Sequence, residues 1–149
     1  MGFLDNKKIL VTGLLSQRSI AYGIAKAMKR EGAELAFTYG GEGIRERVQK
    51  LVPDFDGKIL LPCDVSKDED IDNLFVELGK HWDGLDGFVH AIAFAPREAI
   101  GGVFLDGMTR ENFRIEHDIS SYSFAALADR KSTRLNSSHS SPSRMPSSA

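Results

Sequence analysis

The stretch Lys7–Gly23 (KKILVTGLLSQRSIAYG) constrains the possible fold more than any other part of the chain. The aliphatic run Ile9–Val11 predicts a buried strand, Gly13 allows a turn, and a helical pattern begins at Ser19 and Ile20. The start of a helix offers unpaired N–H groups and the positive end of its dipole, and glycine lets a ligand approach the backbone. We therefore predict that Gly13, Ser19 and Ile20 contact the pyrophosphate of a dinucleotide.

The glycines of this stretch are not enough by themselves to identify a dinucleotide-binding site. The common dinucleotide motif, G-x-G-x-x-G, places three glycines in the turn. Here only Gly13 lies in the turn, and Gly23 lies inside the predicted helix. A strand that ends in glycine before a helix also occurs in flavodoxin-like proteins. A non-catalytic nucleotide-binding or flavodoxin-like signalling module therefore remains an alternative at this point.

Strands and helices alternate along the rest of the chain. Strands are expected at residues 7–12, 33–39, 58–63 and 84–93. Helices are expected over 19–32, with the Ser19 hydroxyl as N-cap, and over 44–52. Two more are expected after a capping box of Ser66 and Glu69 and after a cap at Thr109, with an irregular stretch at 94–108. This alternation predicts an α/β fold, a Rossmann-type doubly wound parallel sheet with strand order 3-2-1-4.

The same order predicts where a ligand would bind. In such sheets the crevice lies beyond the C-terminal ends of the strands, where the strand order reverses, here between the first and fourth strands. Gly13, Asp64 and Val65, and residues 91–95 follow three different strands and should meet there. This convergence indicates a dinucleotide site more strongly than the glycines do.

Composition excludes several classes of protein. With 149 residues, 42% hydrophobic and 27% charged, the chain is not disordered throughout. A net charge of −2 gives no sign of a nucleic-acid or membrane partner. The single cysteine, Cys63, has apolar neighbours and is expected to be a buried side chain in a reducing compartment. No leader peptide or apolar span is visible and the four histidines lack metal spacing, so we expect a cytoplasmic location and no metal.

The character of the chain changes at Asp129. Residues 129–149 contain eight serines and two prolines, and hardly any large apolar side chain. Such a composition predicts disorder. The segment DRKSTRLNSSH at 129–139 also resembles one reading frame of a DNA sequencing-library adapter, which indicates an artefactual tail. We therefore expect a partial dinucleotide-binding domain at 1–128, truncated after the fourth strand and the following helix.

Several segments together resemble a known family: KKILVTG, SIAYGIAKAMKREGAELAFTY, CDV, DGFVHAIAFAP and HDISSYSF. Residues 1–128 are similar to the N-terminal half of bacterial enoyl-[acyl-carrier-protein] reductases, a divergent branch of the short-chain dehydrogenase/reductases. In that branch the spacing from Gly13 to Ser19-Ile20-Ala21 replaces the three-glycine turn. The resemblance implies an NADH-dependent oxidoreductase of type II fatty acid biosynthesis, an enoyl-acyl carrier protein as substrate, and a homotetramer.

The resemblance also implies roles for individual residues. These are pyrophosphate and ribose contacts by Gly13, Ser19 and Ile20, adenine contacts by Asp64 and Val65, a contact along the cofactor by Ile92, and a contact with the acyl substrate by Ala95. His90 is expected to be a packed strand residue. Glu42 can bond a ribose 2′-hydroxyl, whereas Arg45 and Arg47 would favour a 2′-phosphate, and NADH is preferred over NADPH on this basis.

The family's catalytic tyrosine and lysine form a Tyr-x6-Lys pair that follows the fourth strand and its helix. The last tyrosine of this chain is Tyr122, and the only later lysine is Lys131. We therefore expect the catalytic pair to lie beyond the truncation and the chain as written to be inactive. The flavodoxin-like receiver alternative needs acidic residues after the first strand, where Leu14–Gln17 has none.

Overall fold

A computed structural model describes residues 2–135 of the chain. Its four strands are β1 (Lys8–Val11), β2 (Glu34–Tyr39), β3 (Ile59–Pro62) and β4 (Gly87–Val89). All neighbouring strands run parallel, in the order β3-β2-β1-β4. The predicted fold class and strand order are confirmed.

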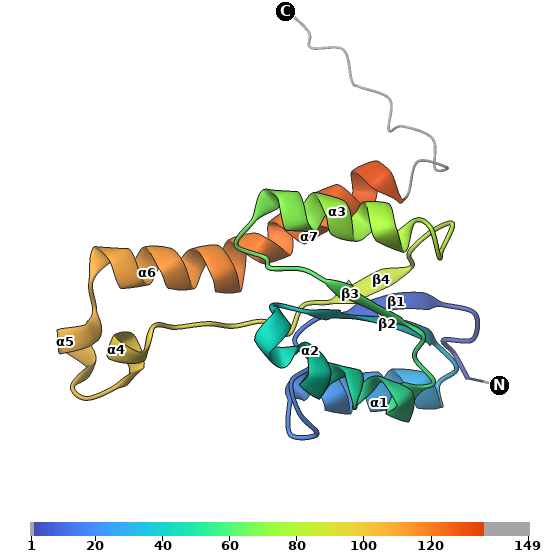
Figure 1. The fold of residues 1–149 in the computed structure, drawn as a ribbon, viewed down its shortest axis with the longest axis horizontal. Coiled ribbons are helices and arrows are strands. Elements are labelled where there is room, and N and C mark those ends of the chain that lie inside the picture. The colour runs from blue at the N-terminus through green and yellow to red at the C-terminus, as the bar shows by residue number, and fades with distance from the viewer. Residues whose placement is uncertain (1, 136–149) are drawn as a thin grey trace, which may run out of the picture.

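Helices cover both faces of the sheet (Figure 1). On one face lie α1 (Ile20–Arg30), α2 (Glu42–Gln49) and the 3₁₀ turn η1 (Val52–Phe55). On the other lie α3 (Asp68–Leu78) and α7 (Ser123–Arg134). Successive residues of a strand point to opposite faces, so Leu10 packs with the α3 and α7 layer whereas Ile9 and Val11 pack with the α1 and α2 layer. The sheet therefore has two cores.

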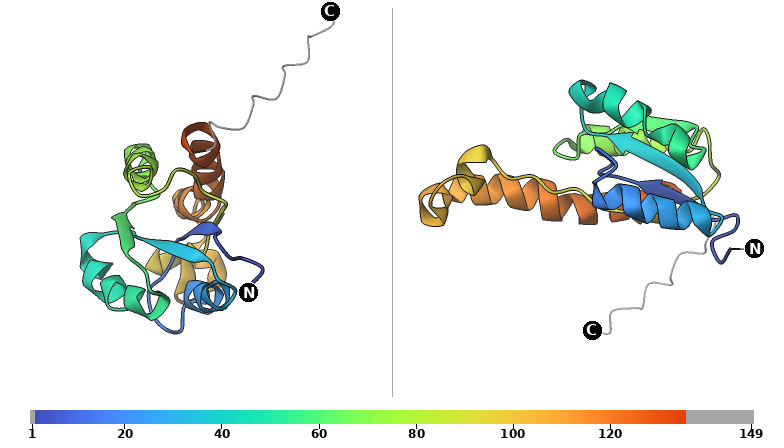
Figure 2. Two further views of the ribbon diagram at one scale, coloured as in Figure 1. Left: turned by 90° about the vertical axis from the view of Figure 1, so that its right-hand side faces the viewer. Right: turned by 90° about the horizontal axis from the view of Figure 1, so that it is seen from below.

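The remaining helices lie apart from the sheet. After β4 the chain forms α4 (Arg97–Ile100), α5 (Phe104–Gly107) and α6 (Arg110–His117). We call residues 95–117 the arm, because they extend away from the sheet in two views of the molecule (Figures 1 and 2). A π-helical segment, η2 (Asp118–Tyr122), joins α6 to α7 and returns the chain to the sheet. None of the helices in residues 2–135 has the length and apolarity that crossing a membrane requires.

Local sequence explains where several elements begin and end. Gly32 follows α1 with φ +89°, a left-handed conformation that ends the helix as expected. Thr109 caps α6, since its hydroxyl oxygen accepts a hydrogen bond from the Asn112 N–H at 3.1 Å. The irregular stretch expected at 94–108 instead contains α4 and α5, and the helix expected over 44–52 ends at Gln49 before η1.

At two expected helix caps, Ser19 and the capping box of Ser66 and Glu69, the predicted hydrogen bonds do not form. Ser19 occupies the cap position of α1, but its hydroxyl donates to the Ser16 carbonyl at 2.6 Å and accepts nothing from the helix. The capping box of Ser66 and Glu69 does not form, because α3 begins at Asp68 and Ser66 bonds to Asp64 instead. In both places a nearby oxygen competes for the hydroxyl.

The expected disorder from Asp129 is wrong for the part that the structure describes. Helix α7 continues to Arg134, and Leu135 is buried in the core beside α3. The Arg130 guanidinium bonds the Asp72 carboxylate of α3 at 2.7 Å. Apolar packing and this ion pair therefore order the chain past residue 128. The rest of the predicted tail, 136–149, lies outside the described residues, and its artefactual origin stays a prediction.

Candidate functional site

A cavity of about 250 Å³ opens at the C-terminal edge of the sheet. It is lined by residues that follow all four strands and by the π-helical segment: Gly13, Leu14, Leu15, Thr38, Tyr39, Gly40, Ile44, Cys63, Asp64, Val65, Ala91, Ile92, Ala93, Phe94 and Ile119. Four residues predicted from the sequence meet here: Gly13, Asp64, Val65 and Ile92. The crevice thus lies where the strand order reverses, as the topology requires.

Gly13 lets the end of β1 pack closely against the chain that follows β4. Its φ of +83° is unfavourable for other residues, and a Cβ atom there would overlap the Ala91 carbonyl oxygen. Next to it, the buried Thr12 hydroxyl donates to the Val89 carbonyl at 2.7 Å and accepts from the Ala91 N–H at 3.4 Å. No sequence motif singles out Thr12, although a hydroxyl that ends an apolar strand is a usable signal. Together these two residues hold the chain after β4 against the end of β1, where Gly13 and Ala91 line the cavity.

Ser19 and Ile20 do not line this cavity. They lie at the first turn of α1, beyond the Leu14–Arg18 loop, and Ile20 is 77% exposed. That turn contains no acidic side chain, so its N–H groups and dipole are not neutralised by a neighbouring carboxylate. The predicted contact of Ser19 and Ile20 with a pyrophosphate stays a prediction.

Asp64 presents an ionised carboxylate at the end of β3. Burial raises its pKa, but hydrogen bonds from the Ser66 hydroxyl and N–H, together with Lys67, outweigh burial and the net pKa is lowered. The Ser66 hydroxyl and N–H both donate to Oδ1, at 2.7 and 3.0 Å, and the Lys67 ammonium lies 3.5 Å from Oδ2. Since a carboxylate accepts about four hydrogen bonds, Asp64 can hold its own turn and still accept from a ligand.

Cys63 contributes a buried wall of the cavity. Its burial, with smaller contributions from Asp70 and Asp64, raises the pKa of the thiol to about 12. The thiolate is the reactive form of cysteine, so this side chain is chemically inert at neutral pH. The expectation of a buried Cys63 is confirmed. Val65, beside it, is also buried and offers an apolar surface.

The end of β2 carries a small polar cluster. The Tyr39 hydroxyl donates to the Glu42 carboxylate at 3.2 Å, and Arg45 lies 3.5 Å from the same carboxylate with its guanidinium 5.8 Å from the Tyr39 ring centre. Arg45 is thus paired with Glu42. Arg47 instead lines a separate open cavity with Arg18. The two arginines weighed for a 2′-phosphate therefore lie in different surroundings.

His90 is packed as expected, but it lies just after β4 and not within the strand. Its Nε2 lies 2.7 Å from the Ser123 hydroxyl, which donates its one hydrogen to the Ile119 carbonyl at 2.6 Å. The hydroxyl can then only accept from the imidazole, so Nε2 carries the proton. Burial lowers the pKa of His90 and favours this neutral form. The imidazole also packs edge-on against Phe124.

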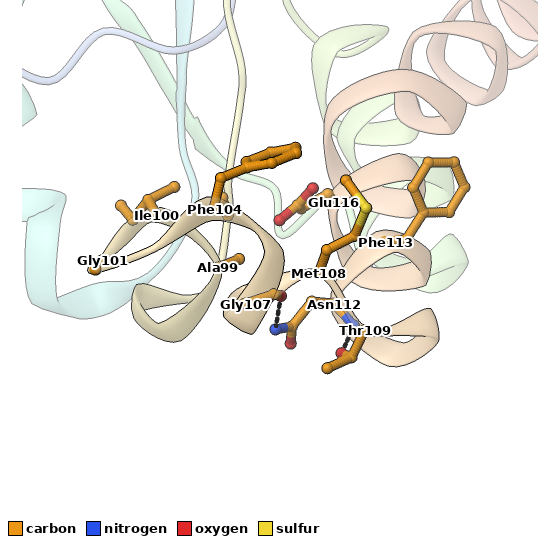
Figure 3. A pocket seen from close by; sticks show the side chains of 12 residues that line it. Ala99, Ile100, Gly101, Phe104, Gly107, Met108, Thr109, Asn112, Phe113 and Glu116 are labelled. Atoms are coloured by element: carbon orange, nitrogen blue, oxygen red, sulfur yellow. Dashed lines mark hydrogen bonds between the residues drawn. The ribbon is translucent and has the colours of Figure 1, made fainter.

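Ala95 lies outside the first cavity and lines two others. One, of about 510 Å³, is open and shares Ala93 and Phe94 with the first cavity, so these residues form a wall between the two. The other, of about 370 Å³, lies in the arm between α4, α5 and α6 (Figure 3). It is largely apolar, with Ile100, Phe104 and Met108 around it, and the Asn112 amide donates to the Gly107 carbonyl at its base.

A Tyr-x6-Lys spacing occurs once in the chain, at Tyr22 and Lys29 in α1. The Tyr22 hydroxyl donates to the Asp54 carboxylate at 3.0 Å, which raises the pKa of Tyr22. Lys29 bonds the Asp54 carbonyl at 3.0 Å and the Asp56 carboxylate at 2.9 Å. Neither residue lines the cavity, so this pair stabilises the α1 and η1 contact and is not a catalytic pair.

Metal-binding geometry is also not found in the described chain. Within residues 2–135, no group of three His, Cys, Asp or Glu side chains is arranged as metal ligands would be. The arrangement offers a crevice with a glycine turn, the Asp64 carboxylate and apolar walls, which are features suited to an organic ligand with an anionic centre.

The strand order, the glycine turn of Gly13 and the crevice between β1 and β4 define a Rossmann-type dinucleotide-binding fold. The sequence model of a family described as Enoyl-(Acyl carrier protein) reductase matches residues 13–142, and the chain belongs to this family. The resemblance noted in the sequence is confirmed, and the flavodoxin-like alternative is set aside.

Two similar proteins carry the name of this family. The chain is 57% identical over 128 residues to an enoyl-[acyl-carrier-protein] reductase [NADH] of Neisseria meningitidis, covering 86% of this chain and 49% of that protein. It is 54% identical over 136 residues to the Escherichia coli enzyme of the same name, covering 91% of this chain and 52% of that protein. The chain therefore spans about half the length of the curated relatives it matches.

The chain also superposes on about half the length of similar solved structures. The enoyl-[acyl-carrier-protein] reductase (NADH) of Aquifex aeolicus superposes with a TM-score of 0.85 at 46% identity, over 90% of this chain and 52% of that one. The reductase of Anaplasma phagocytophilum, solved in complex with NAD, superposes with a TM-score of 0.83 at 37% identity, over 90% of this chain and 51% of that one.

Proposed function

We propose that the chain supplies the NADH-binding part of an enoyl-[acyl-carrier-protein] reductase, which reduces the double bond of enoyl thioesters in type II fatty acid biosynthesis. One observation carries the proposal: Gly13, Asp64, Val65 and Ile92 converge on one crevice at the β1 and β4 switch point. Bound there, NADH would supply the hydride. The relatives named above carry NADH in their names, and one neighbour was solved with NAD.

Each predicted contact has a physical basis in this site. The pyrophosphate would lie between the Gly13 turn, which lines the crevice, and the first turn of α1, which contains Ile20, follows Ser19 and has no acidic side chain. The ionised Asp64 would accept from the adenine amine while Val65 packs on the ring. Ile92 would lie along the cofactor, and Ala95, on the far side of the shared wall, would contact the acyl group.

The choice of NADH over NADPH rests on Glu42. Its carboxylate is held at the end of β2 by Tyr39 and Arg45, near the Gly40 edge of the crevice. A fixed negative charge there would repel a 2′-phosphate and accept from a 2′-hydroxyl. Arg45 is neutralised by the same carboxylate and is less available to a phosphate.

Titration of the chain with NADH, followed by nicotinamide fluorescence, tests the proposal. Asp64→Ala should weaken NADH binding about 10- to 150-fold, because a charge-assisted hydrogen bond is worth roughly 1.5–3 kcal/mol and each 1.4 kcal/mol is a factor of ten. Asp68→Ala is the matched control, because Asp68 is an exposed acidic residue in the first turn of α3 and lines no part of the crevice. Unchanged binding by Asp64→Ala, or no binding by the parent chain, would contradict the proposal.

The chain on its own should bind the cofactor and fail to turn over. The family's Tyr-x6-Lys pair is not found after β4 in this sequence, and donors to a developing oxyanion typically contribute about 10²–10³ in rate. NADH oxidation with crotonyl-CoA measures this. Turnover at the rate of a full-length relative would show that the chain's own residues suffice.

We further propose that the protein is cytoplasmic and assembles as a homotetramer that takes an enoyl-acyl carrier protein as substrate. The arm supports assembly, since Phe104, Phe113 and Leu105 are exposed on it and large apolar surfaces tend to mark interfaces. Light scattering after size exclusion reports the subunit number, and a strictly monomeric protein would count against the tetramer.

A further inference from the structure

The π-helical segment η2 (Asp118–Tyr122) interrupts the long helical run between α6 and α7. Such single π turns insert a residue into a helix and are frequent at functional sites. In this protein the inserted turn directs Ile119 into the wall of the crevice and sets Ser120 against the chain that follows β4. Its neighbour Ser123, the first residue of α7, reaches the same segment of chain.

Ser120 holds both main-chain groups of one residue. Its hydroxyl accepts from the Phe94 N–H at 3.0 Å and donates to the Phe94 carbonyl at 3.2 Å. Phe94 has no place in a strand or helix, so these bonds take the role that a neighbouring strand would otherwise have. The loop end is therefore fixed by a side chain from a distant part of the sequence.

The other end of the loop is fixed as well. Ser123 accepts from the His90 imidazole at 2.7 Å, and Thr12 bonds the Ala91 N–H. Between these anchors and Phe94 lie Ile92 and Ala93, both of which line the crevice. Ala93 and Phe94 also line the open cavity beyond, and so does Ser120. The stretch Ile92–Phe94, which contains the Ala93 and Phe94 wall between the cavities, is thus held at each end by hydrogen bonds.

We propose that Ser120 is a positioning residue for the cofactor: it fixes the Ile92–Phe94 stretch against which the nicotinamide half of the dinucleotide would lie. The inference rests on the proposed function. With adenine at Asp64 and Val65 and the pyrophosphate at the Gly13 turn, the second nucleoside must continue past β1 toward the chain after β4. Ser120 therefore acts on one half of the ligand and leaves the other half untouched.

Two ligands separate these halves in an experiment. NADH contains both nucleosides, whereas ADP-ribose keeps the adenosine half, the pyrophosphate and the second ribose and lacks only the nicotinamide base. For the 149-residue chain, Ser120→Ala should weaken NADH binding about tenfold, the effect expected for losing the two hydrogen bonds to Phe94, and change ADP-ribose binding by less than about twofold. Ser120→Thr keeps the hydroxyl and should restore NADH binding. Ser121→Ala, an exposed neighbour in the same segment, is the matched control.

Amide hydrogen exchange reports on the anchor without any ligand. The Phe94 amide should exchange faster in Ser120→Ala than in the parent, and Ser120→Thr should restore its protection. The thermal melting point, measured alongside, shows whether the variant has lost the fold as a whole.

Each outcome of these experiments either supports or overturns the positioning role of Ser120. Selective loss of NADH affinity, with faster Phe94 exchange and rescue by threonine, supports the positioning role. Equal loss of both ligands with a lower melting point would make Ser120 only structural and overturn it, as would unchanged NADH binding or unchanged exchange. If the parent chain binds neither ligand, the proposed function itself fails and the positioning role fails with it, whatever Phe94 exchange shows.

Discussion

The sheet layer and the arm of this protein use the same kinds of residue in opposite ways. Around the sheet, most large apolar side chains are buried, and Phe37 and Phe75 are almost fully enclosed. In the arm, large apolar side chains such as Phe104 and Phe113 are more than half exposed. Both regions contain regular helices, so the difference lies in what covers them and not in their local structure.

The difference indicates how each part would meet its ligands. The crevice at the sheet is formed by backbone turns and hydrogen bonds that are already satisfied, as at Thr12, Asp64 and Ser120. Because its loops are already ordered, such a site binds a ligand without the entropic cost of ordering them. The arm has an unsatisfied apolar surface, which a subunit or a substrate would have to cover. The proposed cofactor site is therefore preformed, whereas the arm presents an apolar surface that association would cover.

A pair of Phe→Ala variants tests this comparison most directly. Phe37→Ala should lower the free energy of unfolding by about 3–5 kcal/mol, because Phe37 is 0% exposed and packs on Phe55. Phe104→Ala, at 67% exposure, should change it by less than about 0.5 kcal/mol. Urea denaturation measures both. Equal losses would show that the arm is covered in solution, and a smaller oligomer for Phe104→Ala would identify the cover as another subunit.

Cysteine reactivity extends the comparison to chemistry. The pKa of Cys63 rises from its ordinary 9.0 to about 12, so the thiolate population at neutral pH falls by roughly a thousandfold, tenfold for each pH unit. A cysteine introduced by Ile100→Cys on the arm, where the side chain is exposed, should react with a thiol reagent at an ordinary rate. The two thiols in one molecule then serve as mutual controls. Similar rates for both would mean that the crevice opens readily.

The fold and the centre of the site could be predicted from the sequence because they follow from local patterns. Alternating apolar strands and amphipathic helices allow few topologies once crossovers are right-handed. That order brings Gly13, Asp64, Val65 and Ile92 to one edge of the sheet. Each of these steps follows from the sequence pattern alone, without knowledge of where any side chain points.

What could not be predicted depends on contacts between distant residues. The capping box of Ser66 fails because Asp64 takes its hydroxyl and N–H. Helix α7 passes residue 129 because Arg130 meets Asp72 across the layer, which composition does not reveal. Ser120 reaches Phe94 only because of the π turn, and a single inserted residue leaves no periodic signal.

Two glycines with left-handed backbone sharpen the comparison further. Gly13 has φ +83° and Gly102, in the arm, has φ +74°, but a Cβ atom would meet Ala91 at the first and nothing within 4 Å at the second. Gly102→Ala should cost about 1–2 kcal/mol for the left-handed conformation alone. Gly13→Ala should cost more, and should also weaken NADH binding because Ala91 must move. Equal costs by urea denaturation would indicate that the Gly13 turn relaxes without strain.

The smallest expected effect is a pH dependence within the sheet layer. Burial lowers the pKa of His90 below its ordinary 6.5, so the folded protein holds it neutral while the unfolded chain still takes up a proton near pH 6.5. The stability that this gives is fully present above that pH and is lost as the pH falls through 6.5 toward the folded pKa.

His90→Gln keeps a donor for Ser123 and removes the titration. Between about pH 8 and pH 5 the parent's melting point should fall more steeply than that of the variant, with the two close at about pH 8. Parallel curves would show that His90 is protonated in the folded protein as readily as in the unfolded chain.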